Sequence, residues 1–192
     1  MKKADLRKIY LTKQKNLSPV ERIEKSRRIA ERFFRFFDLT AIKYLHCFVP
    51  IEKFNEIETP FIFQKIWREY PRITTLAPRV NFETGEIENL LFSAGTKLAV
   101  NNWQISEPAH DELFDAEKID LVLVPLLCCD REGWRVGYGK GFYDEFLSRC
   151  RPDCLKIGLS YFEPIEKIEN INEYDVKLDY CVTPQNTYVF TA

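Results

Sequence analysis

Three glycines alternate with larger residues in one short segment, which carries the clearest chemical signal in the sequence. Gly137, Gly139 and Gly141 lie between an apolar run at 121–124 and a helix-like segment that starts at Phe142. Glycine lets backbone N–H groups approach a phosphate closely, and a helix N-terminus favours negative charge. The segment therefore predicts a phosphate-binding loop, and a plain glycine-rich turn is the alternative interpretation.

Charged and aromatic residues around this loop fit phosphate chemistry. Arg135 and Lys140 bring positive charge to the loop, and Tyr138 and Tyr143 supply aromatic rings and hydroxyl groups. Asp144 lies in the first turn of the expected helix, where a carboxylate can hold Mg²⁺ against phosphate oxygens or only favour the helix N-terminus. The spacing fits neither a Walker loop, which needs Ser or Thr after its Gly-Lys, nor a dinucleotide fingerprint, which needs glycine at the position of Phe142.

The N-terminal segment adds a second pair of cations. Lys3 and Arg7 lie four residues apart in a helix-like segment, so both side chains can reach one anion from one helix face. A solvated basic face explains the same spacing. His46 falls in an expected strand and His110 in a polar loop, and we assign neither to catalysis.

Cysteine usage excludes two other kinds of site. The six cysteines contain no C-x-x-C pair, so zinc and thioredoxin chemistry lack support. The adjacent Cys128 and Cys129 have no basic partner in the local sequence that would mark a nucleophile. We expect reduced, mostly buried thiols.

The elements that must position these residues alternate between helix and strand. Helices are expected at 3–16, 18–37, 59–69 and 142–150, the second opened by a Ser18-Pro19-x-Glu21 capping box. Strands are expected at 42–49, 73–77 (ending at Pro78), 87–92, 121–124, 155–159 and 181–183. This alternation predicts an α/β layered fold with a mostly parallel central sheet flanked by helices.

Size and charge narrow the class of protein. The 192 residues are 45% apolar and carry 28 basic against 29 acidic side chains, which predicts one domain over 1–192. The near-zero net charge argues against a nucleic-acid partner. The longest apolar run, at 121–129, is too short for a membrane span, and the charged N-terminus does not resemble a secretory signal. We expect a cytoplasmic monomer with no membrane partner.

The string RVGYGKGFYD at 135–144, preceded by an apolar strand, a proline and an aspartate, resembles the 5-formyltetrahydrofolate cyclo-ligase family, also called methenyltetrahydrofolate synthetases. Further segments are similar to that family in the same order: K-x-x-L-R at 3–7, N-E-I-E-T at 55–59, W-x-I-x-E-P at 103–108, and D-x3-D at 175–179 before Thr183. The sequence departs from the family at Leu126, Cys129 and Val136, where glycine, phenylalanine and leucine are usual.

The resemblance implies a NagB/RpiA/CoA-transferase-like fold and an ATP- and Mg²⁺-dependent conversion of 5-formyltetrahydrofolate into 5,10-methenyltetrahydrofolate, with ADP and phosphate as products. The formyl oxygen would attack the γ-phosphate, and N10 would then close the ring as phosphate leaves. ATP would contact Lys3, Arg7, Arg135, Val136, Gly137, Tyr138, Gly139, Lys140, Gly141, Phe142 and Tyr143.

The folate would contact Ile51, Glu56, Trp103, Tyr138 and Tyr143, with Glu58 as the alternative to Glu56 in another loop register. Asp144 and Asp175 match the metal positions, and Glu56, Lys140 and Arg135 match the catalytic ones. Glu56 would meet either the pterin donors or the proton on N10.

Two other functions stay open at this point. One is a module that binds nucleotide or folate without turnover. The other is a phosphosugar isomerase-like enzyme on a related scaffold, which needs an acid/base pair near the glycines and has no need of Lys3, Arg7 or Trp103.

Overall fold

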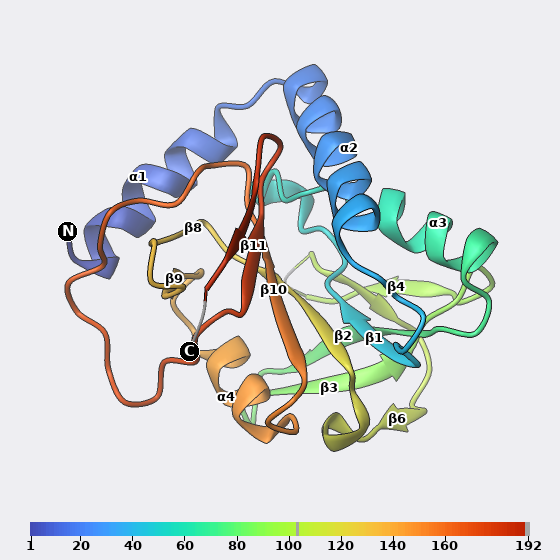
Figure 1. The fold of residues 1–192 in the computed structure, drawn as a ribbon. Coiled ribbons are helices and arrows are strands. Elements are labelled where there is room, and N and C mark those ends of the chain that lie inside the picture. Colours follow the sequence, from blue (N-terminus) through green and yellow to red (C-terminus); the bar gives the residue numbers. More distant parts are fainter. Residues whose placement is uncertain (103, 191–192) are drawn as a thin grey trace.

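The computed structural model describes residues 1–102 and 104–190, and its centre is an eight-stranded sheet (Figure 1). The strand order is β12-β11-β10-β7-β1-β2-β3-β6. The bounds of these strands are β1 Tyr44–Cys47, β2 Thr74–Asn81, β3 Glu86–Leu91, β6 Leu113–Phe114, β7 Leu121–Pro125, β10 Leu155–Leu159, β11 Tyr180–Val182 and β12 Thr187–Val189. Two hairpins stand apart from the sheet, β4 Leu98–Val100 with β5 Ser106–Pro108, and β8 Cys128–Cys129 with β9 Arg135–Val136.

The middle of the sheet is parallel and its edges are antiparallel. The pairs β2-β1, β1-β7, β7-β10 and β10-β11 are parallel, whereas β2-β3, β3-β6 and β11-β12 are antiparallel. The predicted mostly parallel sheet is confirmed. The carboxyl ends of its parallel strands share one edge of the sheet, which is where ligands bind in open α/β folds.

Helices cover both faces of this sheet because its central strands are apolar on both faces. The helices are α1 Lys3–Lys15, α2 Pro19–Phe36, α3 Pro60–Glu69 and α4 Phe142–Arg149, with short 3₁₀ turns η1 Glu52–Phe54 and η2 Ala116–Lys118. Leu121 and Leu123 of β7 pack in one buried cluster with α2 and α3, and Val122 and Val124 pack in another with α4. This alternation follows from the two-residue period of a strand.

The first helix belongs to neither of these layers. The buried face of α1, formed by Leu6 and Tyr10, packs on the β8–β9 hairpin and on Ile168 (Figure 1). α2 opens with the predicted capping box, in which the Ser18 hydroxyl accepts from the Glu21 N–H. No helix in the described part of the chain is both long and apolar enough to cross a membrane.

The prediction that the second strand ends at Pro78 is wrong, because β2 continues to Asn81. The Thr74 N–H donates to Lys43 on the side of β1, and alternation puts the Pro78 nitrogen on that same side. β1 ends at Cys47, so β1 has no residue opposite Pro78 that would need a hydrogen bond from it. The missing N–H of proline therefore costs the sheet no hydrogen bond. Beyond Leu76, β2 is paired only with β3.

Candidate active site

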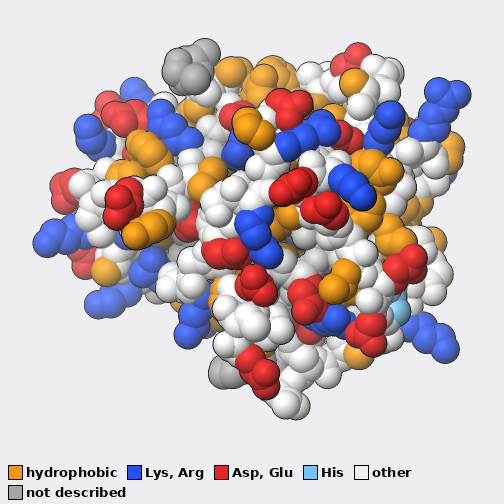
Figure 2. Space-filling view, turned by 90° about the horizontal axis from the view of Figure 1, so that it is seen from below, with side chains coloured by type: hydrophobic (Ala, Val, Ile, Leu, Met, Phe, Trp, Pro, Cys, Tyr) orange, Lys and Arg blue, Asp and Glu red, His pale blue; other side chains and the backbone are white. Residues whose placement is uncertain are grey.

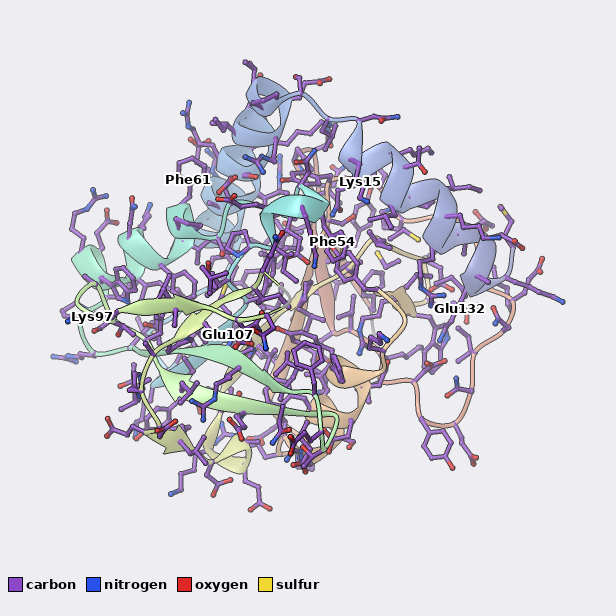
Figure 3. All side chains as sticks on the ribbon, turned by 180° about the vertical axis from the view of Figure 1, so that it is seen from behind. Lys15, Phe54, Phe61, Lys97, Glu107 and Glu132 are labelled. Carbon is purple, nitrogen blue, oxygen red and sulfur yellow. The ribbon has the colours of Figure 1, made fainter. Side chains whose placement is uncertain are left out.

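A cavity of about 850 Å³ lies beyond the carboxyl ends of β1 and β7. Its walls come from α1, the loop after β1, the glycine loop, the first turn of α4 and the segment 172–176. Figure 3 shows Phe54 on η1 and Glu107 on β5, two further contributors to its lining. The lining includes these predicted site residues: Lys3, Arg7, Ile51, Glu56, Arg135, Val136, Gly137, Tyr138, Gly139, Lys140, Gly141, Phe142, Tyr143, Asp144 and Asp175. Trp103, the remaining one, lies outside the described residues.

The glycine loop needs its glycines for two different reasons. Gly139 (φ 95°) and Gly141 (φ 76°) have left-handed backbone that side chains rarely adopt. A Cβ on Gly139 would also lie 2.9 Å from the guanidinium of Arg7. A Cβ on Gly137 or Gly141 would meet no atom within 4 Å, so these positions leave open space beside the cavity. The loop is therefore shaped to leave room for a ligand.

The two cations of α1 contact different parts of the site, although their i, i+4 spacing predicts that both can reach one anion. The Arg7 Nε donates to the Gly137 carbonyl at 3.0 Å, and the Lys3 ammonium pairs with Asp175. The Lys3 N–H also donates to Asn170 Oδ1 at 2.6 Å. α1 thus joins the glycine loop to the segment that carries Asp175, two parts of the chain that lie far apart in sequence.

Arg135 lies behind the loop rather than in front of it. Its side chain is only 5% exposed, and it donates to Asp144 Oδ1 at 2.8 Å and to the Val176 carbonyl. The Val176 N–H donates to the same Asp144 oxygen at 3.0 Å. Arg135 therefore positions Asp144 and the 172–176 segment, and its contact with ATP stays a prediction. Lys140, in contrast, is exposed at the cavity.

Asp144 and Asp175 fit the donor set that Mg²⁺ prefers. In the hydrogen bonds and ion pairs of the described residues, Asp144 uses Oδ1 and Asp175 uses Oδ2, which accepts from the Asn172 N–H at 2.8 Å. One oxygen of each carboxylate is therefore left for a hard cation. No group of three or more His, Cys, Asp or Glu side chains in the described chain gathers as a metal site. A cation bound by these two carboxylates would take its other ligands from phosphate oxygens and water.

Glu56 is buried at the opposite wall, in the loop that follows η1. Its Oε2 accepts from the Ile51 N–H at 2.8 Å, and its carboxylate also bonds to the Tyr138 hydroxyl. Burial raises the pKa of Glu56 to about 7, because the loss of water outweighs these two hydrogen bonds. Such a carboxyl can exchange a proton near neutral pH. Glu58, the alternative, pairs with Arg22 at 3.0 Å and is not part of the cavity lining.

An aromatic wall connects Glu56 to the glycine loop. The rings of Phe54 and Tyr138 stack with centroids 4.9 Å apart. Gln14 of α1 donates to the Phe54 carbonyl at 2.8 Å and to the Tyr138 hydroxyl at 3.0 Å. The wall gives a flat ligand an apolar surface beside a carboxyl group.

Two of the three departures from the family pattern, Leu126 and Cys129, lie outside the cavity lining, whereas Val136 is part of it. Leu126 and Cys129 are buried in the cluster around α4. A Cβ on Gly158 would lie 2.8 Å from Leu126, so glycine in β10 makes room for this larger side chain. All six cysteines are free and buried, as expected. Burial raises the pKa of the Cys128 thiol to about 12, which agrees with the absence of a nucleophile.

Several lining residues were not predicted from the sequence. They include Phe48, Val80, Phe82, Ile105, Glu107 and Tyr174. Phe48 and Phe82 directly follow β1 and β2, so for these two a position just beyond a strand end was an available signal. Glu107 accepts from the Val80 N–H at 3.0 Å and is buried. Tyr174 lies in a segment with no regular element, where periodicity gives no signal.

The family model described as the 5-formyltetrahydrofolate cyclo-ligase family matches residues 1–184 of this chain. The chain belongs to this family. A solved Aquifex aeolicus 5,10-methenyltetrahydrofolate synthetase superposes with a TM-score of 0.83 at 29% identity, covering 100% of this chain and 94% of that one. A Mycoplasma pneumoniae synthetase structure gives 0.76 at 26% identity, covering 96% and 99%.

The 5-formyltetrahydrofolate cyclo-ligase of Mus musculus is 25% identical over 176 residues, which are 85% of this chain and 84% of that protein. The family resemblance and the α/β fold predicted from the sequence are confirmed. Membership of the cyclo-ligase family makes the chain a ligase of folate metabolism and removes support for a phosphosugar isomerase.

Proposed function

We propose that this cyclo-ligase family member converts 5-formyltetrahydrofolate and ATP into 5,10-methenyltetrahydrofolate, ADP and phosphate, with Mg²⁺ bound beside the phosphates. The observation that carries the proposal is one cavity that joins a glycine loop with cations at one wall to a buried, protonatable glutamate at the other. The first wall suits phosphates and the second suits a flat heterocycle with N–H donors.

The phosphate half follows from the loop. The open spaces beside Gly137 and Gly141 admit phosphate oxygens, and the exposed Lys140 supplies the nearest unburied positive charge on the loop. Lys3 and Arg7 add charge from α1. Asp144 and Asp175 would hold a Mg²⁺ ion, which would neutralise phosphate charge.

The folate half follows from the aromatic wall. Ile51, Phe54 and Tyr138 give the pterin an apolar and aromatic surface. Glu56 suits donors of the folate better than phosphates, because a carboxylate repels phosphate oxygens and accepts from N–H groups.

The chemistry needs positioning and one proton acceptor. The formyl oxygen attacks the γ-phosphorus, the bond to ADP breaks, and the formyl group becomes an iminium phosphate. N10 attacks the formyl carbon and loses its proton, and the carbon–oxygen bond then breaks to release phosphate. Glu56, with a pKa of about 7, is the acceptor that we propose for the N10 proton. Holding both substrates in line supplies most of the remaining acceleration.

The test uses the full chain with 5-formyltetrahydrofolate labelled with ¹⁸O in its formyl group. With ATP and Mg²⁺, the proposal predicts growth of the methenyl absorbance in step with ADP, and transfer of the label to the released phosphate. Unlabelled phosphate would contradict the phosphorylation step. Tight binding of both ligands without product would favour a binding module and contradict the proposed enzyme.

A further inference from the structure

His46 lies directly behind the cavity and contacts one of its lining residues. The histidine is fully buried on β1, between Asn89 of β3 and Tyr143 in the first turn of α4. Its Nδ1 lies 2.8 Å from Asn89 Oδ1, and its Nε2 lies 3.3 Å from the Tyr143 hydroxyl. The imidazole also packs on Phe146, with ring centroids 4.7 Å apart. Contacts from two other elements, β3 and α4, therefore fix the orientation of this ring.

The hydrogens in this chain of groups have one consistent arrangement. An amide oxygen only accepts, so His46 Nδ1 must carry a hydrogen and donate it to Asn89. Burial lowers the pKa of His46 to about 3, so the ring is neutral and Nε2 holds a lone pair. The Tyr143 hydroxyl is the only donor in contact with Nε2 among the described residues, and it donates to it.

This arrangement decides what Tyr143 offers to a ligand. A phenol has one hydrogen, and in Tyr143 that hydrogen points back at His46. The oxygen then presents only lone pairs to the cavity. Such an oxygen accepts from an N–H group and repels a phosphate or formyl oxygen.

We propose that His46 is a positioning residue, which orients the Tyr143 hydroxyl as a hydrogen-bond acceptor for an N–H donor of the folate. The identity of the ligand rests on the proposed function, whereas the orientation rests on the geometry of His46, Asn89 and Tyr143 alone. His46 acts through Tyr143 and is itself walled off from the cavity.

The orientation is tested first by ¹⁵N NMR of the histidine side chains in the unliganded wild-type chain. The chain has two histidines, so a His110→Gln variant identifies the signals of His46. The expected result is a neutral ring with hydrogen on Nδ1 and none on Nε2 from about pH 5 to pH 8. Hydrogen on Nε2, or a charged ring in that range, would overturn the inference whether or not the proposed reaction occurs.

The role is tested by steady-state kinetics with matched variants. His46→Leu should raise the KM for 5-formyltetrahydrofolate on the order of tenfold and leave the KM for ATP near its wild-type value, since one hydrogen bond is lost. His46→Gln should retain most of the function, because its amide can donate to Asn89 and accept from Tyr143. The double variant Tyr143→Phe with His46→Leu should raise the KM for 5-formyltetrahydrofolate no more than Tyr143→Phe does alone.

Action through Tyr143 would be contradicted if the effects of the two substitutions on the KM for folate added up in the double variant. It would also be contradicted if His46→Leu raised the KM for ATP as much as the KM for folate. Thermal denaturation of each variant accompanies the kinetics, and a His46→Gln variant that folds with wild-type stability yet behaves like His46→Leu would also contradict it. An inactive wild-type chain would instead refute the proposed function and leave the NMR result standing.

Discussion

At the scale of single residues, Glu56 is a buried carboxyl group whose pKa is raised by the loss of water. Tyr161 donates to its backbone carbonyl at 2.9 Å, and the preceding Asn55 donates to Lys15 of α1 at 2.9 Å. These bonds hold the carboxyl in a buried position where its charged form is disfavoured. Its raised pKa therefore affects folding as well as the proton transfer that we propose for it.

The sign of this effect follows from proton binding. The pKa of Glu56 rises from 4.5 to about 7 on folding, so between these values the folded chain holds a proton that the unfolded chain lacks. Stability then falls as the pH rises through this window. Glu56→Gln has no carboxyl group to ionise, so it does not lose stability in this way. The free energy of unfolding of Glu56→Gln, measured relative to that of wild type, should therefore rise by on the order of 3 kcal/mol between about pH 5 and pH 8.

Urea denaturation of both proteins at the two pH values measures this difference. Glu58→Gln is the matched control for the removal of one carboxyl group, because Glu58 lies two residues further along the chain and outside the cavity lining. If the difference in free energy of unfolding between wild type and Glu56→Gln is the same at both pH values, the Glu56 carboxyl ionises at its ordinary pKa.

Residues in local motifs could be predicted from the sequence, whereas those defined by long-range contacts could not. Lys140 and Tyr143 stand inside the glycine string, and Glu56 stands in a segment similar to the family. His46 has no such signal, since its partners lie 43 and 97 residues away in the chain. A polar side chain inside an apolar strand was the only available indication.

At the scale of elements, two glycines of the glycine loop should respond differently to substitution, Gly137 through ligand binding and Gly139 through stability. Gly137→Ala places a methyl in open space beside the cavity, so the chain should fold normally while the KM for ATP rises at least about tenfold, through lost phosphate contacts. Gly139→Ala forces alanine into φ 95° and against Arg7, so it should lower stability by about 1–3 kcal/mol.

Thermal denaturation and ATP kinetics of the two variants separate these effects. Gly95→Ala serves as the control, because a Cβ there meets no atom within 4 Å and the residue is not in the cavity lining. Gly95→Ala should change neither the thermal stability nor the KM for ATP. An unchanged KM for ATP in Gly137→Ala would place the phosphates elsewhere.

Long periodic elements were predictable and very short ones were not. α4 and β7 follow from apolar patterns of adequate length, and α2 follows from its capping box. β8 and β9 contain two residues each, and β12 contains three, too few to show a two-residue period. The run of β2 through Pro78 depends on where its neighbour β1 ends, which the local sequence does not contain.

At the scale of the whole molecule, the site exists because segments far apart in sequence meet at one end of the sheet. α1 contacts the glycine loop through Arg7 and the C-terminal segment through Lys3, which pairs with Asp175. On the face seen in Figure 2, acidic and basic side chains are mixed, in agreement with the net charge of −1. The cavity lining also carries both signs of charge, with Arg7 and Lys140 beside the glycine loop.

The central claim is that one cavity holds ATP at the glycine loop and folate at the wall of Glu56. Calorimetric titration of Glu56→Gln with ATP and, separately, with 5-formyltetrahydrofolate tests it most directly. The substitution keeps the size of the side chain and removes its charge, so we predict wild-type affinity for ATP and folate affinity at least about tenfold weaker, or about 1.4 kcal/mol. Weaker ATP binding with unchanged folate binding would contradict the proposed arrangement of the two ligands.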